Sequence, residues 1–308
     1  WLFEENHPLT ARVAVNRYWQ MLFGTGLVKT SNDFGNQGSL PSHPELLDWL
    51  AVDFMEHGWD VNRLIRQMVL SAAYQRSSDY REDLNEKDPE NLLLARAPSF
   101  RLQAEMIRDN ALASSGLLNQ KVGGASVRPY QPKGLWREKG NFSRYLNNYT
   151  LTRGDSLYRR SMYTFIKRTS PPPAMQVFDA TSRETCTVKR ERTNTPLQAL
   201  VLMNDPQFIE AARVLAERVQ NQTTSTEAHL TLAFRLLTGR KAGAQERKIL
   251  EELLNDELAA FEAKPEAIAS VLSIGDYPRD PSKEALYTAA LASSINVLMN
   301  HDAFYMRR

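Results

Sequence analysis

Residues whose types and spacing could do chemistry are concentrated between positions 179 and 198. Three arginines of this stretch, Arg183, Arg190 and Arg192, could together hold a carboxylate, sulfate or phosphate group. Asp179 and Glu184 are the candidate catalytic groups, because a hydrolase or lyase needs an acid or base beside the bond it breaks. The alternative is a structural salt-bridge network, in which the carboxylates of the stretch neutralise its arginines.

Neutral polar residues and an upstream aromatic segment extend this candidate site. Asn194 and Gln198 are four residues apart, so they project on the same side of a helix start and suit a polyhydroxylated ligand. Trp136 lies in an irregular segment at 121–154 that also contains Tyr130, Phe142, Tyr145 and Tyr149. These rings could stack on the apolar faces of sugars, or could equally anchor the segment to the rest of the protein. The predicted ligand-binding residues are Arg183, Arg190, Arg192, Asn194, Gln198 and Trp136.

The single cysteine, Cys186, limits the chemistry of the chain. A nucleophilic cysteine needs a nearby base, and none of the five histidines is close to it in sequence. We therefore predict that Cys186 is a small, buried and inert thiol. One cysteine cannot form an intramolecular disulfide, a zinc site of several thiolates or the C-x-x-C-H attachment motif of a haem. We expect neither a metal site nor a cofactor in this chain.

Two helix starts must position the polar stretch. Thr195 can cap a helix that begins with Pro196, and Asp205 can cap another that begins with Pro206. The loop before them must pass close to helix N-terminal ends, whose free N–H groups favour an anion. Upstream, the alternation of residue types over 162–166 predicts one short strand.

Two carboxylates on a predicted helix at 102–118 form a second candidate pair. Glu105 and Asp109 are one turn apart and could serve acid–base chemistry. Arg101 and Arg108 are equally well placed to pair with them. We therefore predict a solvated face of this helix.

Helical periodicity dominates the chain outside the irregular region, and it predicts a mainly α fold. We expect a helical body with a long irregular aromatic and basic region and at most a short strand pair. The prediction is a single domain over 1–308. A possible subdivision places N-terminal helices at 1–120, the irregular region at 121–192 and C-terminal helices at 193–308.

The balance of charge argues against several classes of partner. The 38 Lys and Arg exceed the 36 Asp and Glu by a net charge of +2, which gives no case for binding nucleic acid or an anionic membrane. No apolar run approaches the length of a membrane span. The chain opens with Trp1, without Met or a signal peptide, so we expect a fragment or a processed piece.

Three motifs, in the right order and spread over nearly the whole chain, resemble a planctomycete family, the domain of unknown function 1553. They are NHPLTARVAVNRYWQMLFGTGLVKTSNDFGNQGSLPSHPELLDWLAVDF near the start, RRSMYTFIKRTSPPPAMQVFDATSRETCTVKRERTNTPLQALVLMNDPQFIEAA in the middle, and ALASSINVLMNHDAFYMRR at the end. In that family the domain ends large secreted proteins, usually after a cytochrome c domain and a second uncharacterised domain. The family supplies no catalytic residues to carry over.

The resemblance implies a periplasmic or extracellular protein whose partners are the other domains of its parent protein and a polysaccharide. Any haem would then lie on another domain. The function expected is an exported, cytochrome-associated domain that assists polysaccharide processing or oxidation by binding an acidic or polyhydroxylated ligand. One alternative is a non-catalytic carbohydrate-binding or scaffold module that docks partners. The other is a polysaccharide hydrolase or lyase that uses Asp179 and Glu184.

Overall fold

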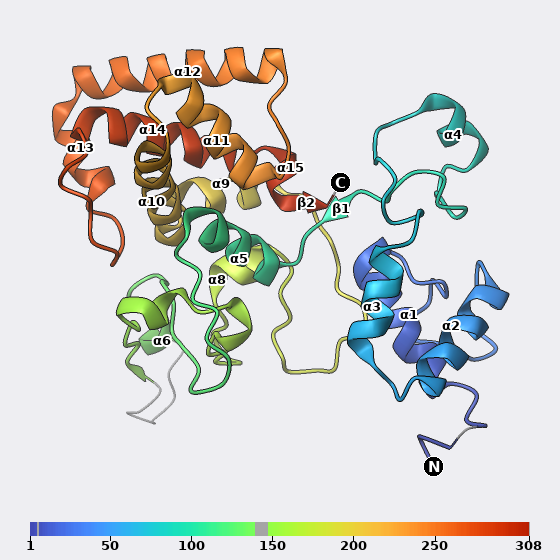
Figure 1. Cartoon of the computed structure of the whole chain (residues 1–308). Coiled ribbons are helices and arrows are strands. Elements are labelled where there is room, and N and C mark those ends of the chain that lie inside the picture. The colour runs from blue at the N-terminus through green and yellow to red at the C-terminus, as the bar shows by residue number, and fades with distance from the viewer. Residues whose placement is uncertain (5, 139–146, 308) are drawn as a thin grey trace. The chain divides into compact units, whose positions relative to one another are not determined.

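A computed structural model describes residues 1–4, 6–138 and 147–307, which gather into two compact units. One unit comprises Trp1–Arg101 with Met306–Arg308, and the other comprises Leu102–Tyr305. Figure 1 shows that helices are the main regular elements of both units. The mainly α prediction, with at most a short strand pair, is confirmed. The single domain and its three-part subdivision stay predictions.

The first unit is built on three helices and closed by a strand pair. Helix α3 begins where the sequence provides a cap, since the Asp60 side chain accepts hydrogen bonds from the N–H groups of Asn62 and Arg63 at 2.9 and 3.1 Å. Strands β1 and β2 pair antiparallel, with Phe100 opposite Arg307. The elements are α1 (Thr10–Phe23), α2 (Pro44–Glu56), α3 (Val61–Val69), α4 (Glu82–Lys87), β1 (Phe100–Arg101) and β2 (Met306–Arg307).

The second unit centres on helix α10, which packs against α5, α11 and α14, while α12 lies against α11 and α14 (Figure 1). Its long helices are α5 (Ala104–Ser115), α9 (Pro196–Asn204), α10 (Pro206–Gln222), α11 (Thr226–Thr238), α12 (Ala244–Ala263), α13 (Pro265–Leu272) and α14 (Ala285–Leu298). Its short elements are α6 (Leu135–Glu138), η1 (Gly154–Tyr158), η2 (Ser161–Tyr163), α8 (Pro173–Val177) and α15 (Asp302–Tyr305).

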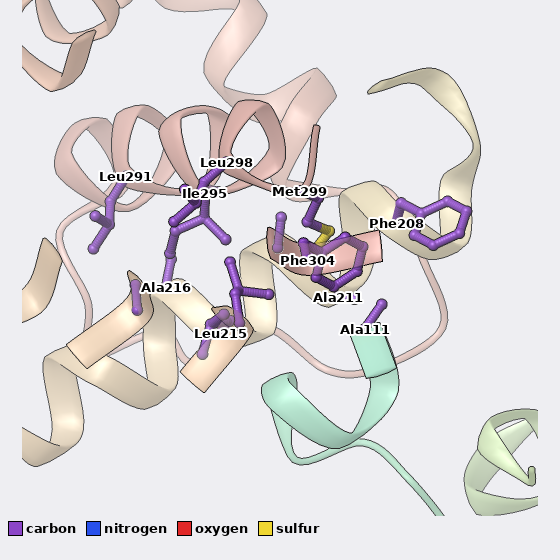
Figure 2. Packing of buried hydrophobic residues seen from close by; sticks show 14 of the residues in the cluster. Ala111, Phe208, Ala211, Leu215, Ala216, Leu291, Ile295, Leu298, Met299 and Phe304 are labelled. Atoms are coloured by element: carbon purple, nitrogen blue, oxygen red, sulfur yellow. The ribbon is translucent and has the colours of Figure 1, made fainter. Parts of the chain in front are cut away.

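Small residues let the central helices of the second unit approach closely. Ala211 and Ala212 on α10 are fully buried, as are Ala289 and Ala290 on α14. Larger side chains interlock around them and make a continuous apolar core. Figure 2 shows part of this core, including Ala111, Phe208, Leu215, Leu291, Ile295, Leu298, Met299 and Phe304.

The predicted strand at 162–166 is wrong. The N–H groups of Tyr163 and Thr164 instead close tight turns on the carbonyls of Arg160 and Ser161, at 2.9 and 3.0 Å. Only Thr164 keeps a strand-like contact, a single parallel bridge to Val127. Alternation over five residues was too short to decide against these local turns.

A buried arginine ties the irregular region to helix α10. Arg108 is buried and donates to the Gln207 side chain at 2.7 Å, and it also donates to the carbonyls of Leu157 and Arg159 at 3.0 and 2.9 Å. Next to it, the Asp109 carboxylate accepts from the N–H and hydroxyl of Ser161 at 2.8 and 2.7 Å. This face of α5 is therefore an anchor for the following loops, and the predicted solvated face is wrong.

Candidate functional site

A cleft of about 1420 Å³ opens in the second unit. Helices α8 and α9 form one wall, and residues of 130–137 and 147–153 form the other. The lining alternates apolar or aromatic groups with polar ones. It includes Tyr130, Trp136, Tyr149, Val177, Leu197, Leu200, Asn204 and Asp205.

Helix α9 presents an apolar face to this cleft. As predicted, it starts at Pro196 behind Thr195, and a capping box joins Thr195 to Gln198. Leu197 and Leu200 are each 54 % exposed, because the face they share lines the cleft instead of entering the core. The opposite side of the helix supplies Leu202, which is buried.

The facing wall is organised around Trp136. Its side chain is only 2 % exposed, with Tyr149 edge-on at 5.0 Å and Phe165 at 5.6 Å between ring centroids. The cations of Arg128 and Lys167 lie 5.3 and 5.1 Å from its ring centre. The indole Nε1 is buried and has no hydrogen-bond partner among the described residues. Trp136 thus anchors the wall more than it offers a free stacking face.

The same wall exposes a tyrosine to the cleft. Tyr149 is partly exposed, and its hydroxyl donates to the carbonyl of Pro129. Two other aromatic residues of the predicted platform, Phe142 and Tyr145, lie outside the described residues.

Asp205 supplies the one carboxylate that lines the cleft within the described part of the chain. It ends α9 and caps α10, as predicted, and its side chain accepts from the N–H of Gln207 at 3.1 Å. Burial raises the pKa of this carboxyl to about 6, against the opposing effects of the Gln207 hydrogen bond and the positive charge of Arg108. The group is therefore ready to exchange a proton near neutral pH.

Behind the cleft, a buried carboxylate holds one wall in place. Glu210 accepts from the hydroxyls of Tyr130 and Tyr158 at 3.0 and 2.8 Å, and from the N–H groups of Asp276 and Tyr277 at 2.6 and 2.7 Å. The backbone of Gly275 passes so close that a β-carbon there would overlap the Glu210 carboxylate. These bonds fix the position of Tyr130 in the cleft wall.

The predicted anion-binding residue Arg190 is already paired. Its guanidinium donates to both carboxylate oxygens of Glu105 on α5, at 2.7 and 3.1 Å. Burial by itself would raise the pKa of Glu105, but the hydrogen bonds from Arg190, the backbone hydrogen bond and the charges of Arg190 and Arg183 hold it below its ordinary value. This pair fastens the loop before α9 to the helical body.

Asp179 and Gln198 meet at Thr193. The Asp179 carboxylate accepts from the N–H of Thr193 at 2.8 Å and from its hydroxyl at 3.0 Å. Gln198 is buried, and its amide donates to the carbonyls of Val177 and Thr193 at 2.9 and 3.2 Å. Both side chains stabilise the loop locally.

The other predicted residues lie on the surface. Arg183, Glu184, Arg192 and Asn194 are exposed, and Arg183 lines a second, smaller cavity. Of the predicted ligand-binding residues, Trp136 alone lines the larger cleft. The structure therefore does not gather the predicted set into one site, and the roles assigned to these residues stay predictions.

The prediction that Cys186 is buried is wrong, because its thiol is exposed. All residues from 183 to 189 are exposed, and this loop offers no apolar surroundings to enclose a sulfur atom.

The importance of Asp205 for the cleft was missed from sequence. The Asp-Pro pair directly after a capped helix indicated a carboxylate at a helix junction, but no local pattern showed that residues of 130–137 and 147–153 would line the same cleft. Likewise, no local pattern showed that Leu200 would line a cleft and stay 54 % exposed.

Comparison with known proteins identifies the family to which the chain belongs. The family model described as PSD1, protein of unknown function (DUF1553), matches residues 1–254. The chain belongs to this family. The resemblance to this family is thereby confirmed over residues 1–254, which contain the first two motifs, while the third motif lies beyond the matched residues. No curated protein matches the chain, and no solved structure does.

Two further observations concern metals and membranes. Across residues 1–4, 6–138 and 147–307, no group of three or more His, Cys, Asp or Glu side chains is arranged to hold a metal ion. Within the same residues, no helix combines the length and apolar character needed to cross a bilayer.

Proposed function

We propose that this protein is an exported carbohydrate-binding module, which assists polysaccharide processing in a cytochrome-associated parent protein, and that the cleft between α9 and residues of 130–137 and 147–153 binds the ligand. The observation that carries the proposal is the large cleft with mixed aromatic and amide lining. Its volume of about 1420 Å³ exceeds the roughly 300–1,000 Å³ of typical small-molecule pockets, so an extended ligand suits it better than a compact one.

The lining matches the chemistry of a sugar chain. Sugars present apolar C–H faces and a rim of hydroxyl groups. Tyr149 and Leu200 offer apolar surface for the first, while Asn148 and Asn204 offer amide groups for the second. Lys133 and Arg137 at the edge of the cleft are exposed and would favour a glycan that carries acidic groups.

Binding without hydrolysis is favoured by the count of carboxylates. Glycoside hydrolysis commonly uses two carboxyl groups about 5–10 Å apart across the bond. Asp205 is the one Asp or Glu lining the cleft within the described residues, and positions 139–146 of the sequence contain neither residue type. Asp179 and Glu184, the predicted catalytic pair, do not belong to the cleft lining described here.

The experiment is binding of the 308-residue chain to a panel of neutral, carboxylated and sulfated polysaccharides, with a cleft variant and a matched control. Leu200→Glu places a charge on the apolar wall at a position that is 54 % exposed, so the fold should persist. Met203→Glu adds the same charge to the same helix at a position 44 % exposed that is not part of the cleft lining.

We expect glycan binding that weakens at least about tenfold in Leu200→Glu and stays unchanged in Met203→Glu. Equal binding by all three proteins would show that the cleft is not the site. Binding to no glycan at all would favour the partner-docking alternative.

Catalysis is tested on the same proteins. Each glycan that binds is incubated with the wild-type chain and with Asp205→Asn, and newly formed chain ends are measured. If the wild-type chain cleaves a glycan and Asp205→Asn does not, the protein is an enzyme and the binding-module proposal is wrong. No release of chain ends is the expected result.

A further inference from the structure

A second cavity of about 470 Å³ lies in the same unit, between the turn at 161–168 and the loop that carries Arg183. Its polar lining comes from segments far apart in the sequence: Ser126, Tyr163, Thr164, Arg168 and Arg183. A pocket of this size admits one sugar residue or a small charged group.

Two cations line this cavity without carboxylate partners. Arg168 and Arg183 are both exposed, and neither forms an ion pair among the described residues. Arg183 is close enough to Glu105 for its charge to lower the pKa of that carboxyl, but the Glu105 carboxylate is hydrogen-bonded to Arg190 at 2.7 Å and does not form an ion pair with Arg183. Glu184, the neighbour of Arg183 in sequence, is exposed and is not part of the cavity lining. The cavity therefore has an excess of positive charge.

Hydroxyl groups in the cavity wall add hydrogen-bonding capacity. Thr164 is only 6 % exposed, and its hydroxyl has no partner within the residues that the structure describes. A buried polar group without a partner is costly unless a ligand or water satisfies it.

Arginine side chains lie beside the tyrosine of the cavity wall. The N–H of Gly123 donates to the Tyr163 hydroxyl oxygen at 2.8 Å, and Arg159 lies over the ring at 3.6 Å. The Gly123 hydrogen bond, followed by the effects of Arg160 and Arg159, holds the pKa of Tyr163 below its ordinary value. The Gly123 N–H is used by Tyr163 itself, whereas the positive charge of the two arginines also favours an anion bound near the ring.

We infer that this cavity is an anion-binding site, in which the guanidinium groups of Arg168 and Arg183 hold a carboxylate or sulfate group. Guanidinium groups bind both anions through paired hydrogen bonds, and two arginines that line one cavity offer two such groups to one anion. The site is distinct from the cleft. Phe165 lines the cavity and Trp136 lines the cleft, and their rings pack together as a partition at 5.6 Å. The inference therefore does not depend on the function proposed for the cleft.

The test measures binding of inorganic sulfate and of glucuronate to the whole chain by calorimetry. The variants are Arg168→Gln and Arg183→Gln, and the control is Arg247→Gln, which removes an equally exposed arginine from α12. Each cavity variant should weaken binding by about tenfold or more, because a charge-assisted hydrogen-bonded pair is lost. The control should bind the anions as wild type does.

Two outcomes would overturn the inference. Wild-type affinity in both cavity variants would show that the anion binds elsewhere, and an equal loss in Arg247→Gln would show general attraction by surface charge.

A comparison of dextran sulfate with inorganic sulfate then distinguishes an anionic group on a polymer from a free ion. Preference for dextran sulfate over inorganic sulfate, lost in Arg168→Gln, indicates a group on a polymer. Equal affinity for both indicates a free ion. Neutral dextran carries no anionic group and is not expected to bind at this site.

Discussion

The guanidinium of Arg190 forms a two-pronged ion pair with the carboxylate of Glu105, with N–O distances of 2.7 and 3.1 Å. The pair joins the loop before α9 to the first turn of α5, across 85 residues of sequence. Both side chains are about one quarter exposed, so water screens the pair only in part. Arg190, which the sequence predicted to bind a ligand, thus holds the loop before α9 against helix α5.

A double-mutant cycle measures this pair. Arg190→Met, Glu105→Gln and the double variant should give a coupling free energy of about 1 kcal/mol in urea unfolding. Since the pKa of Glu105 is lowered in the folded state, the pair's contribution is present above about pH 4.3 and is lost as the pH falls further. A coupling free energy of zero would mean that the pair does not contribute to the unfolding free energy.

Asp205 should make stability depend on pH in the opposite sense. Its folded pKa of about 6 lies above the unfolded value of about 3.9, so stability should fall as the pH rises between them. Asparagine caps a helix as well as aspartate does and carries no charge. We expect Asp205→Asn to match wild type at about pH 4 and to exceed its unfolding free energy by about 2–3 kcal/mol at about pH 7.

Unfolding curves in urea at the two pH values check this prediction. Asp205→Ala, which loses the cap as well, should be less stable than Asp205→Asn by about 1 kcal/mol at both. Parallel pH profiles for wild type and Asp205→Asn would contradict the shifted titration.

We predict that Gln198 stabilises the loop before α9 and does not bind a ligand. Gln198→Ala removes the donor to Val177 and Thr193 and should cost about 1–3 kcal/mol of unfolding free energy. Asn194→Ala, at an exposed position four residues earlier, should change stability by less than about 0.5 kcal/mol. Loss of glycan binding in Gln198→Ala without loss of stability would reverse this assignment.

The exposure of Cys186 gives a direct chemical test. A maleimide should label the native protein to one equivalent, at a rate close to that of the urea-unfolded chain. A much slower native reaction would show that the thiol is shielded. Cys186→Ser serves as the unlabelled control and should unfold at the same urea concentration as wild type.

Local sequence signals predicted the helices well and the site poorly. Caps such as Thr195 and Asp205 act within one turn, so their helix starts could be read directly from the chain. The partner of Arg190 could not be predicted in this way, because Glu105 is 85 residues away and no local sequence pattern links the two residues. The loop residues Arg183 and Asp179 have positive φ angles, a local geometry that non-glycine residues rarely adopt and that residue type did not indicate.

Local sequence signals also could not predict the cleft, because its lining residues are far apart in the sequence. Leu200 has the residue type and spacing of a core position, yet it lines a cleft together with residues of 130–137 and 147–153, which are far from it in sequence. Trp136 was identified correctly as a notable aromatic, but whether it would be a platform or an anchor depended on the rings that surround it. Burial is set by tertiary packing, which residue type constrains only weakly.

The close approach of Gly275 to Glu210 restricts the order in which this sequence can change. Gly275 has a φ of 107°, and any β-carbon there would occupy the space of the carboxylate that holds Tyr130 and Tyr158. A first substitution at 275 would break that hub, whereas a shorter residue at 210 would remove both the hub and the obstacle. Descendants of this chain that lose Glu210 would still meet the disfavoured φ at 275, so a change at 275 needs both the loss of that carboxylate and a shift of the local backbone.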